Sequence, residues 1–284
     1  VNPIDWYTGV AGESDVTIAC LGISPLLEGE EGESIASPDK GDRLDIGLPQ
    51  NQVDFLKKIR DNAEKLVVVL TGGSPIASPE VYDMADALLF VWYPGEQGGM
   101  AIADVIFGDK SPSGRLPLTF PKSLDDIPPY EDYSMEGRTY RYMKKEPLFP
   151  FGFGLSYTTF KYSDLQLSAT RVDKGEPVVA EVTVTNTGDM RAEEVVQMYL
   201  TDLKASVRAP IYALKGFKRV SLWPGESASI RFEITPELME LVNNDGDHVL
   251  ESGEFRVTIG GSVPGPRSMD LGASPMAEAS FRVR

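Results

Sequence analysis

The chain has 284 residues, of which 42% are apolar, and its formal net charge is −16. This length is comfortable for two domains, each able to bury its own core. The acidic charge argues against nucleic acid and anionic lipid as partners, and no apolar run approaches the roughly 20 residues that cross a bilayer.

Short apolar runs dominate the first part of the chain. They predict strands at 15–23, 66–71 and 87–92, and the segment 116–120 predicts a further short strand. Such runs lack polar alternation, which indicates a mostly parallel sheet covered on both faces. The only cysteine, Cys20, falls in the first run, where we expect a buried strand thiol.

Helical patterns separate these runs. Apolar residues recur at helical spacing after Pro49, at Val53, Leu56 and Ile59, and the segment 98–107 predicts a second helix that ends at Gly108. Strands that alternate with helices are typical of an α/β three-layer sandwich.

The segment 121–159 is rich in proline, tyrosine and charge. It is too aromatic for a disordered tail, so we expect an ordered connector whose rings pack against the domains. From Phe160 onward the apolar period changes to two, as in 179–185, 195–200, 229–234 and 255–259. Many short alternating strands separated by turns predict a fibronectin type III-like β-sandwich.

The patterns divide the chain into three parts. We expect an α/β sandwich domain at 1–125, the connector at 126–159 and the all-β sandwich at 160–284. No sequence repeat or low-complexity segment is present.

Several classes of chemistry lack the residues they need. The only histidine is His248, in a turn-like segment of the sandwich, which argues against Ser-His-Asp and Cys-His hydrolases and against a catalytic zinc site. The chain has no Gly-x-Ser-x-Gly and no phosphate-binding Gly-x-x-x-x-Gly-Lys motif. We therefore predict no cofactor and no metal, and carboxylate chemistry remains.

An acidic segment follows the first predicted strand and carries four glutamates within six positions: Glu28, Glu30, Glu31 and Glu33. In open α/β sheets, loops that bind ligands leave the carboxyl ends of strands. Composition favours a solvated surface loop or a weak Ca²⁺ site. The alternative is a glycosidase acid, because crowded carboxylates raise one another's pKa, as a general acid requires.

Two further motifs lie near this segment. Asp42 or Arg43 is expected to form a salt bridge that holds the loop. The turn Gly72-Gly73-Ser74 after the second strand could bind an anion through its backbone amides, although a plain tight turn is the more common use of such a sequence.

Motifs along nearly the whole chain resemble family 3 glycoside hydrolases. They are the Glu-rich segment with Gly41-Asp42-Arg43, the segments 92–108, 112–121, 138–142 and 147–158, and the sandwich motifs at 186–188, 194–199, 214–219 and 224–226. The resemblance implies three parts in the complete enzyme: a β/α barrel with an aspartate nucleophile, an α/β sandwich with the acid/base glutamate, and a bracing fibronectin-type domain.

Only the second and third parts are visible in this sequence. The chain begins Val1-Asn2-Pro3 without a signal sequence, so it reads as a piece of a longer protein or as a subunit whose barrel is a separate chain. The resemblance puts the acid/base role on Glu30. Because the loop varies in length across the family, Glu31, Glu28 and Glu33 remain alternates, and no residue is assigned to substrate binding.

The predicted function is the acid/base-bearing part of a retaining exo-β-glycosidase that removes glucose or xylose from β-linked oligosaccharides or glycosides. The alternative is a non-catalytic carbohydrate- or protein-binding fragment. The expected partners are the substrate and a barrel domain or chain of the same enzyme, and a homodimer is left open. The resemblance favours a secreted or periplasmic location.

Overall fold

The structure, a computed structural model, describes residues 3–29 and 43–284. The chain divides into two compact units. The first comprises Val1–Ile106 and Phe120–Ile127, and the second comprises Phe107–Thr119 and Pro128–Arg284. The domain limits expected from the sequence, at 125 and 159, stay a prediction.

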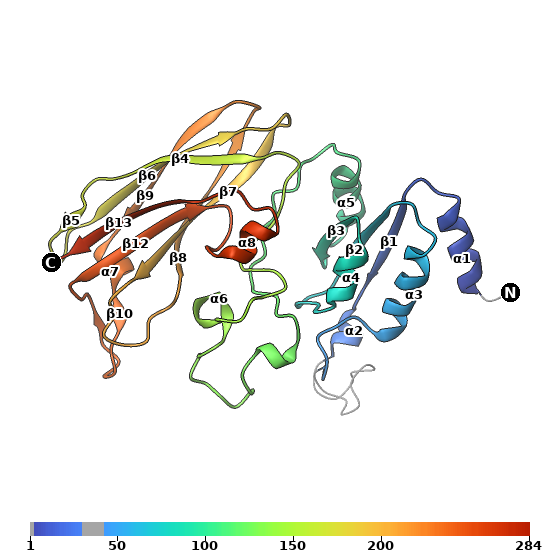
Figure 1. The fold of residues 1–284 in the computed structure, drawn as a ribbon, viewed down its shortest axis with the longest axis horizontal. Coiled ribbons are helices and arrows are strands. Elements are labelled where there is room, and N and C mark those ends of the chain that lie inside the picture. The colour runs from blue at the N-terminus through green and yellow to red at the C-terminus, as the bar shows by residue number, and fades with distance from the viewer. Residues whose placement is uncertain (1–2, 30–42) are drawn as a thin grey trace. The chain divides into compact units, whose positions relative to one another are not determined.

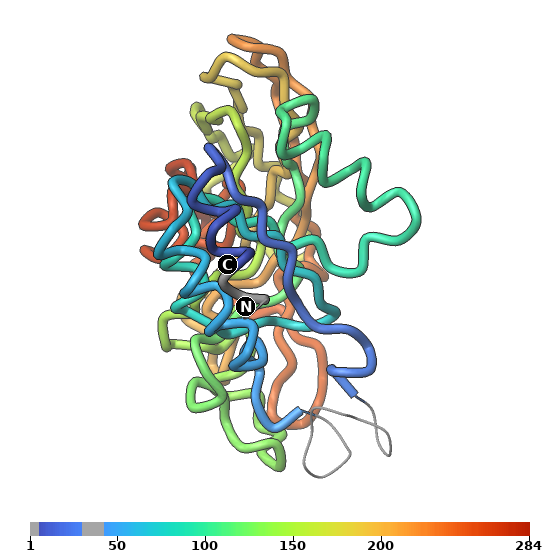
Figure 2. The backbone as a smooth tube through the Cα atoms, turned by 90° about the vertical axis from the view of Figure 1, so that its right-hand side faces the viewer, coloured from blue at the N-terminus to red at the C-terminus, as the bar shows by residue number. Residues whose placement is uncertain are grey.

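The first unit is built on a parallel sheet with the strand order β1-β2-β3 (Figure 1). The strands are β1 (Thr17–Gly22), β2 (Leu66–Thr71) and β3 (Ala87–Trp92), and the register aligns Thr17 with Leu66. The other elements are α1 (Pro3–Gly12), α2 (Pro25–Glu28), α3 (Gln50–Arg60), α4 (Pro79–Met84), α5 (Gly98–Ile106) and the 3₁₀ helix η1 (Leu124–Asp126). Figure 2 shows this part of the backbone in blue to teal.

The core of this unit forms where the apolar side of α3 meets the sheet. Val53, Leu56 and Ile59 recur every three residues, so they fall on one face of the helix, and all three are buried. They share a hydrophobic cluster with Leu66 and Val68 of β2, which are fully buried. The predicted helix after Pro49 and the three predicted strands are therefore confirmed.

Cys20 lies on β1 as expected, but its side chain is exposed and not buried. β1 is an edge strand of the described sheet. Successive side chains of a strand point to opposite faces, so Ala19 enters the core while Ile18, 43% exposed, and Cys20 face away from it. The prediction of a buried thiol was wrong because apolar composition does not reveal which face of an edge strand is covered.

The prediction of a strand at 116–120 was also wrong. Leu116 donates its amide to the Phe153 carbonyl at 2.9 Å and accepts from the Gly152 amide at 2.8 Å. Its backbone groups are thus satisfied by a loop of the second unit. Pro117 then has no amide to continue a ladder.

The strands of the second unit form a β-sandwich, drawn from yellow-green to red in Figure 1. One sheet has the order β4-β6-β9 and the other the order β5-β13-β12-β7-β8. A small hairpin joins β10 to β11. The strands are β4 (Phe160–Leu167), β5 (Arg171–Val172), β6 (Val178–Asn186), β7 (Ala192–Asp202), β8 (Ala213–Leu222), β9 (Ser227–Ile234), β10 (Leu241–Val242), β11 (His248–Val249), β12 (Gly253–Gly260) and β13 (Ala277–Val283), and the helices are α6 (Thr139–Tyr142), α7 (Pro236–Met239) and α8 (Pro266–Asp270).

Strands in which buried and more exposed residues alternate form the core of the sandwich. Val178, Ala180, Val182 and Val184 of β6 are all fully buried, while the residues between them are more exposed. This period of two is the pattern from which the strands were predicted. The fold class, an α/β sandwich with a parallel sheet followed by an all-β sandwich, is confirmed.

The connector divides into packed and exposed parts. Tyr140 stacks on Phe151, with ring centroids 4.1 Å apart, and meets the edge of Tyr199 of β7. Tyr130 and Tyr133 are instead 83% and 80% exposed. The expectation that the connector's rings are packed is therefore right for Tyr140 and wrong for these two.

Candidate functional site

The candidate site lies in the first unit, where β1, β2 and β3 end. The strands are parallel, so their carboxyl ends share one edge of the sheet. Each is followed by a polar group: α2 with Glu28 follows β1, Gly73 and Ser74 follow β2, and Tyr93 follows β3. Ligand-binding loops of open α/β sheets occupy this edge.

The Glu28 carboxylate collects hydrogen bonds from the two neighbouring strand ends. One oxygen accepts the Tyr93 hydroxyl at 2.5 Å and the Gly73 amide at 3.2 Å, and the other accepts the Ser74 hydroxyl. The turn after β2 therefore does bind an anion, and the anion is a side chain of the same chain. Ser74 and Tyr93 were not singled out from the sequence as partners of the acidic segment.

Gly73 is required by the closeness of these contacts. A Cβ built on it would lie 2.7 Å from the Tyr93 ring and 2.9 Å from a Glu28 carboxylate oxygen. Real Cβ atoms do not approach other atoms this closely. Only glycine lets the backbone amide reach the carboxylate here.

Arg43 holds the other end of the segment. Its guanidinium donates to the Ser74 hydroxyl at 2.8 Å and to the Gly47 carbonyl at 3.4 Å, and lies 4.0 Å from the Glu28 carboxylate. The predicted salt bridge is thus formed by Arg43. Asp42, the alternative, lies outside the described residues.

Gln52 ties the end of β1 to α3. Its side-chain amide accepts from the Gly22 amide at 2.9 Å and donates to the Gly22 carbonyl at 2.7 Å. The strand end that leads into α2 is therefore held by two bonds. Together these contacts place Glu28 and Arg43, the residues that flank 30–42, at one edge of the sheet.

The contacts also set the ionisation of Glu28. Burial alone raises the pKa of Glu28, but the three hydrogen bonds and the nearby guanidinium outweigh this effect, so the pKa is lowered. Burial and the hydrogen bond to Glu28 raise the pKa of Tyr93 to about 12, which keeps its hydroxyl a donor at neutral pH. A general acid needs a raised pKa. The described contacts make Glu28 an anchor of the segment, and its role as an alternate acid/base stays a prediction.

The other predicted acid/base candidates, Glu30, Glu31 and Glu33, lie outside the described residues. Within residues 3–29 and 43–284, no group of three or more His, Cys, Asp or Glu side chains could hold a metal ion. No described helix is both long enough and apolar enough to span a membrane.

Two family models match the chain. The glycosyl hydrolase family 3 C-terminal domain matches residues 3–157, which is more than half of the chain, and the fibronectin type III-like domain matches residues 194–263. The chain belongs to glycosyl hydrolase family 3. The resemblance found in its motifs is confirmed, and so is the fibronectin type III-like character of the second unit.

Curated proteins and solved structures match most of the chain. A periplasmic β-glucosidase of Salmonella typhimurium is 39% identical over 269 residues, covering 90% of this chain and 34% of the relative. A putative β-xylosidase of Formosa agariphila is 40% identical over 265 residues, covering 92% of this chain and 34% of the relative. A solved β-glucosidase from Erythrobacter marinus matches with a TM-score of 0.82 and 32% identity, over 99% of this chain and 36% of that one. The chain thus spans about a third of the length of the curated family 3 relatives it matches.

The anchor predicts an effect on stability. Glu28→Gln should lower the free energy of unfolding of the first unit by about 1–3 kcal/mol at neutral pH, because three donors lose a charged acceptor. Hydrogen exchange of the β2 amides reports this unit separately. Glu64→Gln, an exposed glutamate in the same unit, should change little.

The same anchor predicts a pH dependence. Because the pKa of Glu28 is lowered on folding, its carboxylate stabilises the fold fully above the unfolded pKa of about 4.3 and loses this effect as pH falls through the lower, folded pKa. The difference between wild type and Glu28→Gln should therefore shrink on acidification below about pH 4.3. A difference that grows on acidification would mean that Glu28 carries a raised pKa, as an acid catalyst does.

Proposed function

We propose that this chain is the acid/base-bearing part of a retaining exo-β-glycosidase that removes glucose or xylose from the non-reducing end of β-linked oligosaccharides or glycosides. The observation that carries the proposal is the anchoring of Glu28 and Arg43 at the carboxyl edge of the sheet. Glu28 precedes Glu30, Glu31 and Glu33 and Arg43 follows them, so the chain on both sides of these three glutamates is held at the edge where α/β domains bind ligands. Membership of family 3 supports acid/base chemistry for this segment.

In this proposal Glu30 is the general acid/base, with Glu31 and Glu33 as alternates and Glu28 as the anchor. The acid protonates the leaving oxygen, and the same residue later activates the water that releases the sugar. A retaining enzyme needs a second carboxyl group about 5–5.5 Å from the first, on the other side of the bond. We assign that group to an aspartate of a β/α barrel outside this chain.

The names of the relatives support a location outside the cytoplasm, since one of them is a periplasmic β-glucosidase. They support both glucose and xylose as the sugar removed, because β-glucosidases and β-xylosidases both match. A barrel partner is consistent with the share of the relatives that this chain covers. A homodimer stays a prediction.

The experiment is a reconstitution. The purified chain should not hydrolyse an aryl β-glucoside or β-xyloside by itself, and hydrolysis should appear when the barrel part of the same enzyme is added. The matched control is the barrel with a Glu30→Gln chain, which should restore much less activity. Hydrolysis by the chain alone would contradict the assignment of the second carboxyl group to a barrel outside this chain. A barrel that binds the chain without any hydrolysis would instead favour the non-catalytic fragment.

A further inference from the structure

Two tyrosines of the connector are almost fully exposed. Tyr130 and Tyr133 are 83% and 80% exposed, and Met135 close by in the sequence is 42% exposed. The two ring centroids lie 6.5 Å apart, and the ring planes are inclined by 66°. We call Tyr130 and Tyr133 the tyrosine pair. Large rings gathered in contact with water are unfavourable, and such groups on a protein surface mark binding sites.

The loop that carries the tyrosine pair, residues 128–139, is held from one side by Arg138. The Arg138 guanidinium donates to the carbonyls of Pro128, Pro129 and Asp132. The Asp132 amide also donates to the Pro129 carbonyl at 3.0 Å. Each proline ring fixes its own φ angle. The backbone directly before each tyrosine is therefore constrained, although the rings themselves face water.

Arg208 holds the other half of the loop. It pairs with Glu136 at 3.0 Å and donates to the Ser134 carbonyl at 3.4 Å. The Ser134 amide donates in turn to the Asp132 carboxylate at 2.9 Å. Both tyrosines thus stand on a backbone that is already ordered. A surface of this kind loses little conformational entropy when it binds a ligand.

Two residues of the loop have an unusual backbone conformation. Met135 has a φ of 63° and Thr139 a φ of 54°, in the left-handed region that favours glycine. A β-branched residue such as Thr139 is rarely found there. Backbone strain of this kind lowers stability and is concentrated at functional sites. The loop therefore keeps its shape at a cost, which supports a function beyond joining the two units.

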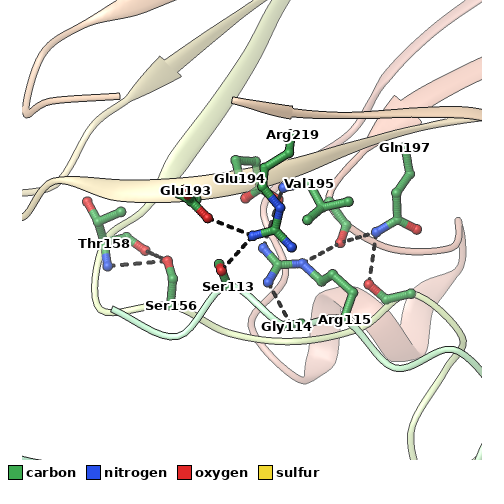
Figure 3. A network of polar contacts seen from close by, with 12 residues as sticks. Ser113, Gly114, Arg115, Ser156, Thr158, Glu193, Glu194, Val195, Gln197 and Arg219 are labelled. Atoms are coloured by element: carbon green, nitrogen blue, oxygen red, sulfur yellow. Dashed lines mark hydrogen bonds and ion pairs between the residues drawn. The ribbon is translucent and has the colours of Figure 1, made fainter. Parts of the chain in front are cut away.

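The buried charges in Figure 3 are paired within the chain and differ in this respect from the tyrosine pair. Arg115 Nη2 lies 2.7 Å from Glu194 Oε1, and the two side chains are only 9% and 5% exposed. Arg115 also donates to the carbonyls of Gly261, at 3.2 Å, and Gly114, at 3.0 Å. These groups compensate one another inside the second unit, so they stabilise its packing and do not recognise a ligand.

The charges around the tyrosine pair favour a neutral ligand. The loop carries three carboxylates, Glu131, Asp132 and Glu136, and one guanidinium, Arg138, so it repels anions. Glu131 is exposed and forms no hydrogen bond or ion pair with residues 3–29 and 43–284. Its carboxylate can accept a hydroxyl, and the tyrosine hydroxyls can both donate and accept. The loop therefore offers aromatic faces and hydrogen-bonding groups together.

The size of the tyrosine pair suits an oligosaccharide better than a protein. Two tyrosine side chains bury about 300–500 Å² at most, which is less than the roughly 800 Å² per partner of a standard protein interface. A β-linked pyranose is flat, with C–H groups on its ring faces and hydroxyls around its rim. Its faces stack on aromatic rings, and its hydroxyls bond to phenols and carboxylates.

We propose that Tyr130 and Tyr133 form a platform that binds a neutral β-linked oligosaccharide by stacking on its pyranose rings. The choice of ligand rests on the proposed function, because a β-glycosidase acts on such sugars. The platform takes no part in bond cleavage. It holds the glycan to the enzyme.

Titration of the whole chain with xylohexaose and cellohexaose, followed by calorimetry, tests the platform. At least one of these β-linked probes should bind saturably. Tyr130→Ala and Tyr133→Ala should each weaken that binding about threefold to tenfold, because each removes one stacking ring. Tyr130→Phe and Tyr133→Phe keep the rings and should weaken binding less than the alanine variants do.

Phe217→Ala is the matched control. It removes another exposed ring of the second unit, 67% exposed and on β8, and should leave the affinity unchanged. All three rings are exposed, so none of the alanine variants should lower the melting temperature by much. Loss of binding by the tyrosine variants then reports the lost contact and not a lost fold.

The absence of saturable binding by both β-linked probes would overturn the proposal. Binding that the Tyr130→Ala, Tyr133→Ala double variant leaves unchanged would do the same, as would an equal loss in Phe217→Ala. The reconstitution with the barrel tests the other use of such a surface. If the chain binds neither probe and the double variant binds the barrel more weakly, the tyrosine pair belongs to a protein interface and the platform is wrong.

The platform and the proposed function can fail separately in these experiments. A chain that restores hydrolysis with the barrel but binds neither probe would overturn the platform alone. A chain that binds a probe through the tyrosine pair but restores no hydrolysis would support the platform and contradict the catalytic role.

Discussion

Replacing Glu30 with Gln in the complete enzyme is expected to lower turnover on substrates with poor leaving groups by about 10²–10⁴-fold. Such leaving groups cannot depart without a proton, and glutamine has none to give. The change preserves the shape of the side chain. A loss of this size would therefore report lost proton transfer and not altered packing.

The choice of substrate leaving group and of added nucleophile distinguishes the step that forms the glycosyl-enzyme intermediate from the step that releases the sugar. Activated aryl glycosides should form the glycosyl-enzyme intermediate at nearly normal rate, because their leaving groups need little protonation. Azide attacks the intermediate without a general base, so added azide should restore turnover of Glu30→Gln. The expected product is a glycosyl azide with the configuration of the substrate, which NMR identifies.

Glu28→Gln is the sharpest control for this experiment. Glu28 is held by Ser74 and Tyr93 with a lowered pKa, so its replacement should disturb the anchor without removing the proton donor. Azide should not rescue it. If Glu31→Gln shows the large loss and the azide rescue while Glu30→Gln stays near wild type, the register of the assignment is wrong by one residue.

The sequence predicted a helix or strand where a single hydrophobic pattern runs along the whole element. The parallel strands β1, β2 and β3 are continuous apolar runs, and β6 alternates along its whole length, so all were predicted. The edge strand β8 was not. Its burial pattern has no period of two, since residues 217–219 are all exposed. The helix α1 was missed because Pro3–Gly12 carries two glycines and no amphipathic repeat.

The position of the candidate site could be predicted from the sequence, but the hydrogen-bond partners within it could not. Three strand ends on one edge follow from the parallel sheet, so the location of the acidic segment could be inferred. The partner of Glu28 could not, because Ser74 and Tyr93 lie 46 and 65 residues away. A stronger signal was available for Glu194. It is a charged residue at an inward position of an alternating strand, and such a residue needs a buried partner.

That partner is Arg115, and breaking the pair should have a large effect. Arg115→Met is expected to lower the free energy of unfolding of the second unit by about 3–5 kcal/mol, because it leaves the Glu194 charge buried without a counterion. Hydrogen exchange of the β7 and β12 amides measures this unit by itself. Adding Glu194→Leu should recover much of the loss, since a buried ion pair replaced by apolar residues is often neutral in stability.

The neighbouring residue of β7 supplies the matched control. Glu193 pairs with Arg219 at the same distance, 2.7 Å, but these side chains are 49% and 52% exposed. Water screens their charges and solvates whichever one is left, so Arg219→Met should cost no more than about 1 kcal/mol. If Arg115→Met and Arg219→Met cost the same, burial does not govern these pairs. If the Arg115→Met, Glu194→Leu double variant is as unstable as the single one, the loss comes from the packing of the arginine stem and not from an uncompensated charge.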